Sequence, residues 1–411
     1  MPTPQYARWQ TPSIQQALRN RRIVVLAGAR QCGKTTLAKT FITPDTDYRT
    51  LDDLSLMQAA MHDPQAFVVH HKQMMIIDEI QRVPLLLQAL KQAVDTDQTP
   101  GRFLLTGSAN IQARPGVTES LAGRIRTLRL RPLAYGEIYR HTPDFLPQAF
   151  KESFQIPNGL QHDKDTYLLE ALQGGYPEPH LLSLTEAQQW YADYLNALME
   201  RDLQDLLQIR RQDSMQSLLG VLAAWSSKFI DLSAIGAKMA LSRPTLQGYI
   251  NALEALYIIE KIPPFLKTDY ERINKHYKLF MADTGLMGTL LNWNLDNVRL
   301  DGDRNGKLIE TFVFTQLMAH IEAQETRYQL YHYRDREQRE IDFIIENNQE
   351  ELLCVEVKAS SLVTHETFKH ILWFQKNVVP QKKSIGIVFY TGQHILSFGN
   401  SLWAVPISVL Y

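Results

Sequence analysis

The sequence predicts an α/β protein of several domains, with a parallel sheet in its first third. The chain has 411 residues, and at about 150 residues per domain this suggests two to three domains. Over the first third, short apolar runs alternate with helical segments, which is the pattern of a doubly wound parallel sheet. A mainly helical middle follows, and short strands return towards the carboxyl end.

The composition excludes several classes of protein. Lys and Arg number 43 against 44 Asp and Glu, so the net charge is −1 and binding to DNA would need a local basic patch. Two cysteines, Cys32 and Cys354, exclude a disulfide framework and disfavour a structural zinc site. No apolar run approaches the ~20 residues of a membrane span, and no secretory signal is seen. We therefore expect a cytoplasmic protein with no membrane contact.

Four strands, with helical segments between them, are predicted before residue 145. Arg22–Ala27 is apolar and β-branched, and the chain then turns through glycine into a helical stretch. Met74–Asp78 and Phe103–Thr106 are two further buried strands, with Pro84–Val94 helical between them. Arg126–Leu130 is the fourth strand, and it ends shortly before a proline.

A phosphate-binding loop is predicted between the first strand and its helix, with the pattern G-x-x-x-x-G-K-T. Its residues are Gly28, Ala29, Arg30, Gln31, Cys32, Gly33, Lys34, Thr35 and Thr36. Glycines let backbone N–H groups close around phosphate, and the helix N-terminus adds its dipole. We expect Lys34 to contact the β and γ phosphates and Thr35 to ligate Mg²⁺. A glycine turn with an incidental lysine is the alternative, and the strand and helix around the loop argue against it.

Acidic and polar residues at the ends of two later strands complete such a site. Asp78 would hold the hydration shell of Mg²⁺, and Glu79 would polarise the attacking water. A strand that simply ends in solvated acids is the alternative. Ser108 is expected to orient the water, with Asn110 in reserve, although both residues also suit a turn.

Arg124 follows a helix and precedes the fourth strand. In that place an arginine can complete the phosphate site of a neighbouring subunit as a finger. A cation at a helix end explains the residue equally well.

These motifs resemble the AAA-type ATPase domain of a large bacterial and archaeal family with an uncharacterised C-terminal region. The matching segments are GARQCGKTTL, IIDEIQ, LLTGS, LAGR with RPLAYGE, GGYPE, RDL, and KLF with DTGL. The resemblance implies ATP and Mg²⁺ as cofactors, ATP hydrolysis, and Arg124 as an arginine finger within a homo-oligomer. Ser108 departs from the pattern, because many AAA proteins have Asn there, and its shorter side chain weakens that assignment.

The middle of the chain predicts helices and then a winged helix. Leu232–Met239 and Thr245–Tyr257 form a helix-turn-helix pattern, and Ile258–Ile262 follows as a strand. One function would be to read DNA. However, the exposed face of the second helix carries no Lys or Arg after Arg243, so anchoring to phosphates would be poor. We favour a structural or protein-contacting role.

Two strands near the carboxyl end carry an acidic cluster. Glu356 and Lys358 are two residues apart, so they share one face of a strand, and Asp342 lies on the strand before. Carboxylates on adjacent strands can bind a divalent metal, and the lysine can stabilise an attacking hydroxide or developing phosphate charge. A solvated sheet face with alternating charges is the alternative.

The spacing of these residues resembles the PD-(D/E)xK core of restriction endonucleases, since 13 residues separate Asp342 from Glu356 and Lys358 follows. That resemblance implies Glu310 as the acid on the preceding helix. It also implies metal ligation by Glu310, Asp342 and Glu356, with Lys358 as a catalytic residue.

Together these observations predict four domains and two alternative functions. The domains are a P-loop AAA-type domain at 1–145, a helical lid or connector at 146–215, a winged helix at 216–275 and a nuclease-like α/β domain at 276–411. The first function is ATP hydrolysis coupled to a metal-dependent, nuclease-like domain that acts on DNA. The alternative is an ATP-driven switch or scaffold whose C-terminal domain only binds DNA or protein.

Overall fold

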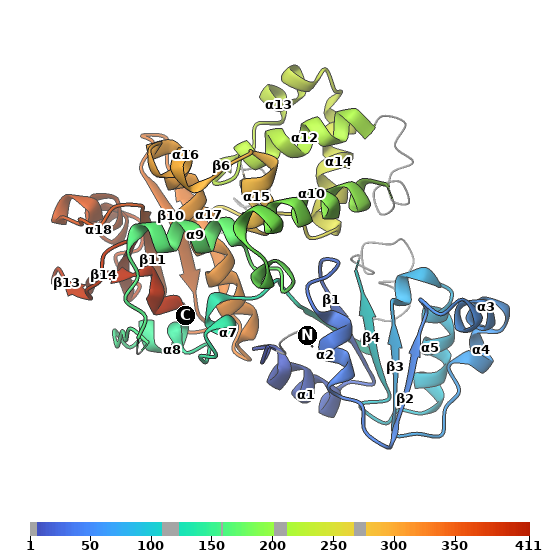
Figure 1. The fold of residues 1–411 in the computed structure, drawn as a ribbon. Helices are drawn as coiled ribbons and strands as arrows, with labels where there is room; N and C mark the ends of the chain where they lie inside the picture. Colours follow the sequence, from blue (N-terminus) through green and yellow to red (C-terminus); the bar gives the residue numbers. More distant parts are fainter. Residues whose placement is uncertain (1–5, 109–122, 158, 201–211, 267–276) are drawn as a thin grey trace. The chain divides into compact units, whose positions relative to one another are not determined.

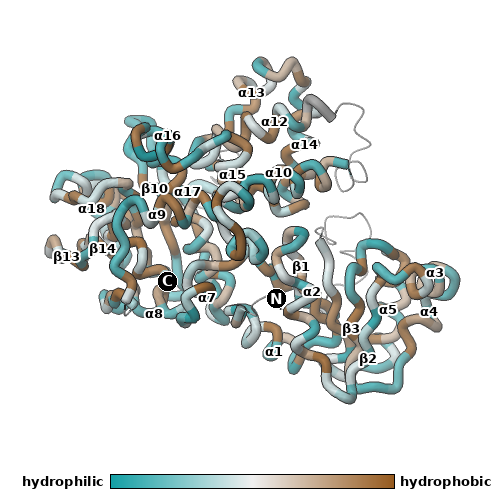
Figure 2. The backbone as a smooth tube through the Cα atoms, in the orientation of Figure 1, coloured by the Kyte–Doolittle hydropathy of each residue, from teal (hydrophilic) through white to brown (hydrophobic). Residues whose placement is uncertain are grey.

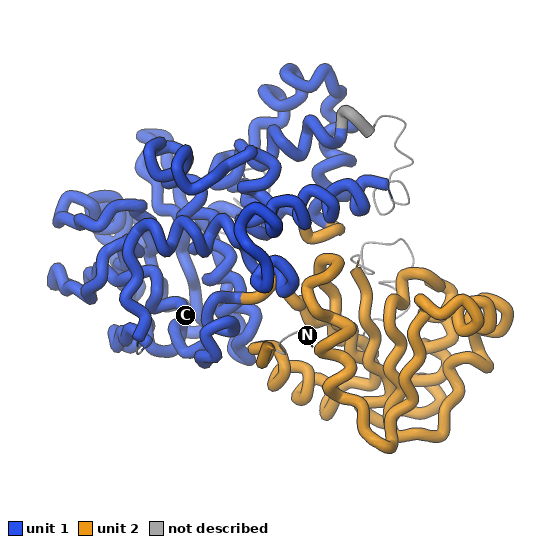
Figure 3. Tube along the Cα trace, in the orientation of Figure 1, with its two compact units in different colours: residues 1–4, 134–254, 258–411 blue, residues 5–133, 255–257 orange. Residues whose placement is uncertain are grey.

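The computed structural model describes residues 6–108, 123–157, 159–200, 212–266 and 277–411 (Figure 1). The chain forms two compact units, shown in Figure 3. We call residues 5–133 with 255–257 the N-terminal unit, and residues 1–4, 134–254 and 258–411 the C-terminal unit. Among the described residues, no helix is both long and apolar enough to cross a membrane.

The N-terminal unit is built on a parallel five-stranded sheet of order β2-β3-β4-β1-β5. All four strands predicted from the sequence are present. The strands are β1 (Ile23–Ala27), β2 (Thr46–Thr50), β3 (Met74–Asp78), β4 (Phe103–Gly107) and β5 (Ile125–Arg129). The helices are α1 (Thr11–Asn20), α2 (Lys34–Lys39), α3 (Leu54–His62), α4 (Pro64–Phe67), α5 (Leu86–Thr96) and the short 3-10 turn η1 (Ile80–Arg82).

Both faces of this sheet are buried, which explains why its central strands are mainly apolar and carry polar residues only at their carboxyl ends. On β1, Ile23 and Val25 belong to one core cluster, while Val24 and Leu26 belong to the other. Strand β2 was missed because its sequence, TDYRT, is polar, and all five of its residues are half-buried. It lies at the edge of the sheet, where only one neighbour pairs with it.

The first half of the C-terminal unit is mainly helical. Its second half carries further helices and most of the strands of two sheets. Its helices are α7 (Tyr135–Ile138), α8 (Phe145–Ala149), α9 (Lys164–Gln173), α10 (Leu184–Glu200), α12 (Gln212–Ala224), α13 (Leu232–Met239), α14 (Arg243–Ala255), α15 (Thr284–Leu290), α16 (Leu295–Arg299), α17 (Gly302–Ala323) and α18 (Lys369–Asn377), with 3-10 turns η3 (Pro179–Leu181), η5 (His365–Phe368) and η6 (Ile407–Leu410). The predicted order of helix, turn, helix and strand is confirmed at α13, α14 and β7 (Ile259–Ile262).

The larger of the two sheets is mixed, and its order is β13-β14-β12-β11-β10-β9. Its strands are β9 (Gln329–Arg334), β10 (Glu340–Glu346), β11 (Leu352–Lys358), β12 (Ser384–Tyr390), β13 (Leu396–Ser397) and β14 (Leu402–Pro406). The smaller sheet has the order β6-β8-β7, where β6 is Lys228–Phe229 and β8 is Lys278–Met281. In Figure 2, brown stretches along β10 and α17 mark apolar residues of these elements, while α16 is mainly teal. Cys354 of β11 is fully buried in this core.

Two sequence motifs of the C-terminal unit contact each other. Asp283 caps the start of α15, where its carboxylate accepts a backbone hydrogen bond of 2.8 Å from Leu286. The same carboxylate accepts a bond of 2.7 Å from the backbone N–H of Gly175. Gly174 has φ +73°, and an added Cβ would lie 2.3 Å from the hydroxyl of Tyr191. The GGYPE and DTGL segments therefore have a shared structural role.

Candidate nucleotide site and acidic cluster

The phosphate loop begins where β1 ends, and two glycines give it its shape. Gly28 lies against β5, so that a Cβ there would come 2.1 Å from the carbonyl oxygen of Leu130. Gly33, at the start of α2, has φ +99°, a conformation that favours glycine. The pattern of two glycines therefore reflects one close approach and one left-handed turn.

Hydrogen bonds of Arg8 and of the loop residue Cys32 hold this loop in place. The Arg8 guanidinium donates to the carbonyl oxygen of Cys32 at 2.9 Å and to that of Arg131 at 2.6 Å. The Cys32 thiol is fully buried and contacts the carbonyl oxygen of Leu130 at 3.3 Å. Sequence reasoning missed Arg8, because it lies 20 residues before Gly28, the first loop residue, and belongs to no motif.

The structure brings the predicted magnesium-ligating residues of the loop and of β3 together. The hydroxyl of Thr35 donates to both carboxylate oxygens of Asp78, at 2.9 and 3.0 Å. Thr106 also donates to this carboxylate, and Tyr48 does so at 3.2 Å. Burial, and then the charge of Asp78, raise the pKa of Tyr48, which therefore acts as a neutral donor. Asp78 is held by three hydroxyl groups beside the loop.

Lys34 is buried at the start of α2, and its ammonium donates to the carbonyl oxygen of Ala29 at 2.6 Å. The ammonium is therefore folded back over the loop to which it belongs. The remaining predicted loop residues lie at its surface: Arg30 is half-buried, Gln31 is exposed with φ +60°, and Thr36 is exposed.

Glu79 follows Asp78 in a left-handed conformation, with φ +59°, and its backbone N–H donates to Thr106 at 3.0 Å. The amide of Gln81 donates to the Glu79 carboxylate and, at 2.9 Å, to the hydroxyl of Ser108. The structure therefore brings Glu79 and Ser108 together through a residue that the sequence reasoning did not select. The sequence feature that could have identified Gln81 is its place as the last residue of the IIDEIQ segment. Asn110 lies outside the described residues.

Arg124 lies at the amino-terminal ends of the parallel strands, whereas the phosphate loop of its own chain lies at their carboxyl-terminal ends. Its carbonyl oxygen accepts a hydrogen bond from Ile23, the first residue of β1, while the loop follows the last. Five strand residues at about 3.3 Å each separate the two ends by roughly 16 Å. The Arg124 guanidinium pairs with Asp95, with Nη2 3.1 Å from Oδ2. A subunit's own phosphates are thus beyond the reach of its Arg124.

Two of the acidic residues predicted near the carboxyl end, Glu310 and Asp342, come together around a lysine that was not selected. The ammonium of Lys278, on β8, lies 2.6 Å from Glu310, 2.9 Å from Glu340 and 3.1 Å from Asp342. Burial would lower the pKa of Lys278, but Glu310, Asp342 and Glu340 together raise it well above its ordinary value. Lys278 was noted only as part of the KLF segment.

Glu356 and Lys358 form their own pair at the edge of this cluster. The Lys358 ammonium lies 3.0 Å from Oε2 of Glu356. The register of Phe343 with Val355 places Asp342 beside β11, where it accepts a hydrogen bond of 3.0 Å from Val357. Burial, and then the charge of Asp342, raise the pKa values of both Glu310 and Glu356.

The arrangement of the cluster does not fit the expected metal site. Among the residues that the structure describes, no group of three or more His, Cys, Asp or Glu side chains is arranged to hold a metal ion. Oxygens of Glu310 and Asp342, two of the expected ligands, lie at hydrogen-bond or ion-pair distance from Lys278, and the third, Glu356, is paired with Lys358.

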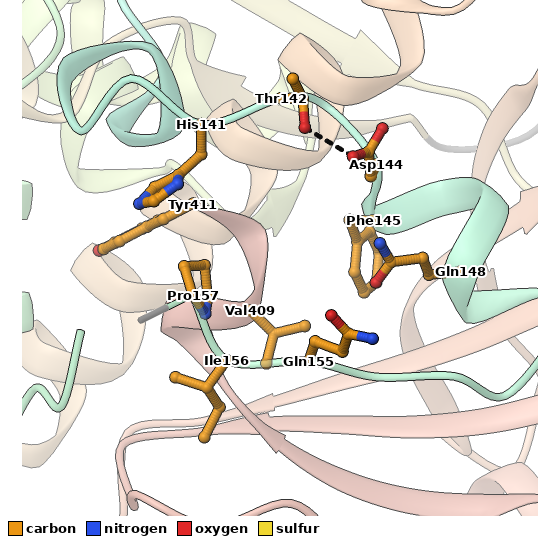
Figure 4. Close-up of a pocket in the computed structure, with 10 residues that line it drawn as sticks. All are labelled: His141, Thr142, Asp144, Phe145, Gln148, Gln155, Ile156, Pro157, Val409 and Tyr411. Carbon is orange, nitrogen blue, oxygen red and sulfur yellow. Dashed lines mark hydrogen bonds between the residues drawn. The ribbon is translucent and has the colours of Figure 1, made fainter. Parts of the chain in front are cut away.

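A pocket of about 290 Å³ lies elsewhere in the C-terminal unit. Figure 4 shows it between the segment that carries α8 and the last residues of the chain, with Thr142 bonded to Asp144 at 2.6 Å. Its lining residues are His141, Thr142, Asp144, Phe145, Gln148, Gln155, Ile156, Pro157, Val409 and Tyr411. No residue of the two predicted sites is among these.

Three family models match successive parts of the chain. Residues 20–139 match a model described as an AAA domain. Residues 164–297 and 305–410 match two domains of unknown function, DUF8612 and DUF4143. The first match and the parallel sheet with its phosphate loop make the N-terminal unit an AAA-type P-loop α/β domain.

Similar proteins of known sequence include two uncharacterized proteins, Mb2031c of Mycobacterium bovis and Rv2008c of Mycobacterium tuberculosis. Each is 27% identical over 338 residues, which are 81% of this chain and 69% of the relative. Similar solved structures include the Orc1 protein of Aeropyrum pernix in complex with DNA, with 12% identity and a TM-score of 0.27 over 73% of this chain and 96% of that one. A RuvB variant of Thermotoga maritima has 16% identity and a TM-score of 0.28 over 61% and 88%.

Proposed function

We propose that the chain is an ATP-driven switch: the N-terminal unit binds and hydrolyses Mg²⁺–ATP, and the C-terminal unit binds a partner without cutting it. The observation that carries the first part is the contact of Thr35 with Asp78 beside a glycine-rich loop, with Glu79 next in sequence. A loop lysine, a hydroxyl and a strand-end acid in this arrangement are the parts that P-loop ATPases use.

Each residue has a separate task in this proposal. Backbone N–H groups of the loop and the ammonium of Lys34 bind the phosphate oxygens. Thr35 and Asp78 would hold Mg²⁺, which neutralises charge on the phosphates when it is bound. Glu79 orients a water molecule and takes its proton, and Ser108, joined to Glu79 through Gln81, helps to fix the position of that water.

Arg124 is proposed to act on the nucleotide of a neighbouring copy of the chain. Its place at the far end of the strands from its own loop supports this, since a finger that acts in trans has to face away from its own site. The ATPase would therefore be a homo-oligomer whose sites are completed between subunits.

For the C-terminal unit, the ammonium of Lys278 beside Glu310 and Asp342, two of the expected metal ligands, favours binding over metal-dependent cleavage. Of the two functions expected from the sequence, the switch is the one that needs no metal at this cluster. DNA is the partner that we propose to test first. Gel assays of linear, nicked and single-stranded DNA with Mg²⁺ or Mn²⁺, with and without ATP, should show retarded but uncut DNA. Metal-dependent cleavage that is lost in Asp342→Asn would contradict this part of the proposal.

The test of ATP hydrolysis separates binding from chemistry. Lys34→Ala should weaken the binding of a fluorescent ATP analogue at least tenfold, because phosphate contacts are lost. Glu79→Gln should keep that binding but lower kcat roughly 100-fold or more, because only activation of water is lost. Lys91→Ala, on helix α5, is the matched control and should change neither value. Wild-type turnover in both Lys34→Ala and Glu79→Gln would refute the assignment.

A further inference from the structure

Lys278 is a charged side chain held almost entirely out of water. Its relative exposure is 1%, and it begins β8, the central strand of the small sheet. The rings of Phe229 and Phe280 have their centroids 5.9 Å from the ammonium. A buried charge is costly unless oppositely charged or polar groups surround it, so this lysine depends on its partners.

Those partners form an oxygen shell around one cation centre. Glu310 comes from α17, and Glu340 and Asp342 come from β10. One oxygen of each carboxylate lies between 2.6 and 3.1 Å from the ammonium. A lysine ammonium is a compact point charge with three donors, so three carboxylate oxygens can satisfy it completely.

Two of these carboxylates, Glu310 and Asp342, are residues that the nuclease resemblance predicts to be metal ligands. The remaining oxygen of Asp342 accepts the backbone N–H of Val357. Glu356, the third expected ligand, is paired with Lys358. A divalent cation would have to displace one ammonium and compete with another, and β8 would have to move before Lys278 could reach water.

We propose that the ammonium of Lys278 is a cation built into the protein, in the place where the nuclease resemblance puts a metal ion, so that the cluster binds neither Mg²⁺ nor Mn²⁺. The side chain also joins β8 of the smaller sheet to helix α17 and to β10 of the larger sheet. The groups that face it are the carboxylates of Glu310, Glu340 and Asp342, with Glu356 and the ammonium of Lys358 beyond them. This inference rests on the part of the proposed function that concerns the C-terminal unit.

The first test measures metal binding by the full chain without nucleotide. Asp78→Asn is used as the background, because it removes the carboxylate that we propose as a metal ligand of the N-terminal unit. Mn²⁺ is titrated, and the free ion is read from its electron paramagnetic resonance signal. We expect no Mn²⁺ to bind at the cluster, so that a further Asp342→Asn change alters nothing. Binding that disappears with Asp342→Asn would overturn the inference.

The second test removes the built-in cation. Lys278→Met in the same background keeps the length of the side chain and leaves three carboxylates without their ammonium. We expect this protein to gain one Mn²⁺ site that binds at least tenfold more tightly than the background does and is lost again with Asp342→Asn. Lys358→Met removes a lysine that faces one carboxylate, and it should gain no such site.

Burial of three unpaired carboxylates could keep Lys278→Met from folding in metal-free buffer. In that case, recovery of the circular dichroism spectrum on addition of Mn²⁺ is the expected result. A folded Lys278→Met protein that binds no Mn²⁺, or an unfolded one that Mn²⁺ does not rescue, would contradict the inference. Because DNA cleavage is scored separately, cleavage by a wild type that binds no metal at the cluster would refute the proposed binding function and leave this inference standing.

Discussion

The side-chain amide of Gln81 donates a hydrogen bond of 2.9 Å to the hydroxyl oxygen of Ser108. The same amide donates to the carboxylate of Glu79. One glutamine therefore joins the end of β3 to the end of β4, at the edge of the sheet where the phosphate loop lies. If Glu79 orients the attacking water, Gln81 is the residue that fixes the orientation of the Glu79 carboxylate.

Replacing Gln81 should slow hydrolysis without weakening ATP binding. Gln81→Leu keeps the size of the side chain but removes both hydrogen bonds, so we expect kcat to fall roughly 10- to 100-fold while KM stays within about twofold. Gln65→Leu, an exposed glutamine on α4, is the matched control. Steady-state phosphate release measures both values. A raised KM with unchanged kcat would show that Gln81 acts on binding instead.

Arg124 should be needed by the neighbouring subunit. Arg124→Ala should lower kcat about 10³-fold or more, as expected for a finger. Mixing Arg124→Ala with Lys34→Ala chains should restore part of the activity, because each supplies what the other lacks. Arg102→Ala is the control, since Arg102 pairs with Asp97 just before β4. Full activity of a dilute monomer, or no recovery on mixing, would exclude action in trans.

The parallel sheet could be predicted from sequence because its strands are apolar on both faces and its loop has a fixed spacing. Strand β2 could not, because TDYRT carries no apolar pattern and becomes a strand only by pairing with β3. Asp78 and Glu79 were identified by their position at a strand end. Gln81 and Arg8 were missed, since their roles depend on contacts with residues distant in sequence.

Stability should fall in mild acid because of a buried histidine. Burial lowers the pKa of His320, on α17, from 6.5 to about 4, and its Nε2 lies 2.9 Å from the carbonyl oxygen of Leu410. Between these two pH values the unfolded chain binds the proton and the folded chain does not. The free energy of unfolding should therefore fall as pH drops from 6.5 towards 4, by about 3 kcal/mol from this group.

The measurement is urea unfolding at several pH values. His320→Gln keeps a donor for Leu410 but cannot titrate, so its stability should depend less on pH over this range. His365→Gln, at an exposed position of η5, should follow the wild-type curve. Parallel curves for His320→Gln and the wild type would contradict the assignment.

Gly174 should be intolerant of even a single methyl group. Gly174→Ala would place a Cβ 2.3 Å from the Tyr191 hydroxyl and 2.7 Å from Oδ1 of Asp283, at a φ of +73°. We expect the free energy of unfolding to fall by about 3 kcal/mol, from crowding and backbone strain together. Gly220→Ala, on α12 with no neighbour within 4 Å of the added atom, should be neutral or stabilising. Thermal unfolding would compare the two variants.

The acidic cluster shows where sequence reasoning stops. The spacing of Asp342, Glu356 and Lys358 predicted that they would lie on adjacent strands, which the register of β10 and β11 supports. Lys278 is more than 60 residues away from Asp342 and belongs to another sheet, so no local pattern could connect them. A motif can specify which acids meet, but the charge that balances them depends on the tertiary fold.

Both cysteines of the chain, Cys32 within the phosphate loop and Cys354 in the core of the larger sheet, are fully buried. The folded protein therefore presents no native thiol to a maleimide reagent, and it needs no cysteine-free background for labelling. Cysteines introduced at the exposed positions of Gln65 and Leu362 would place one spectroscopic label on each unit. The distance between those labels, recorded before and after ATP is added, would test whether the two units move relative to one another.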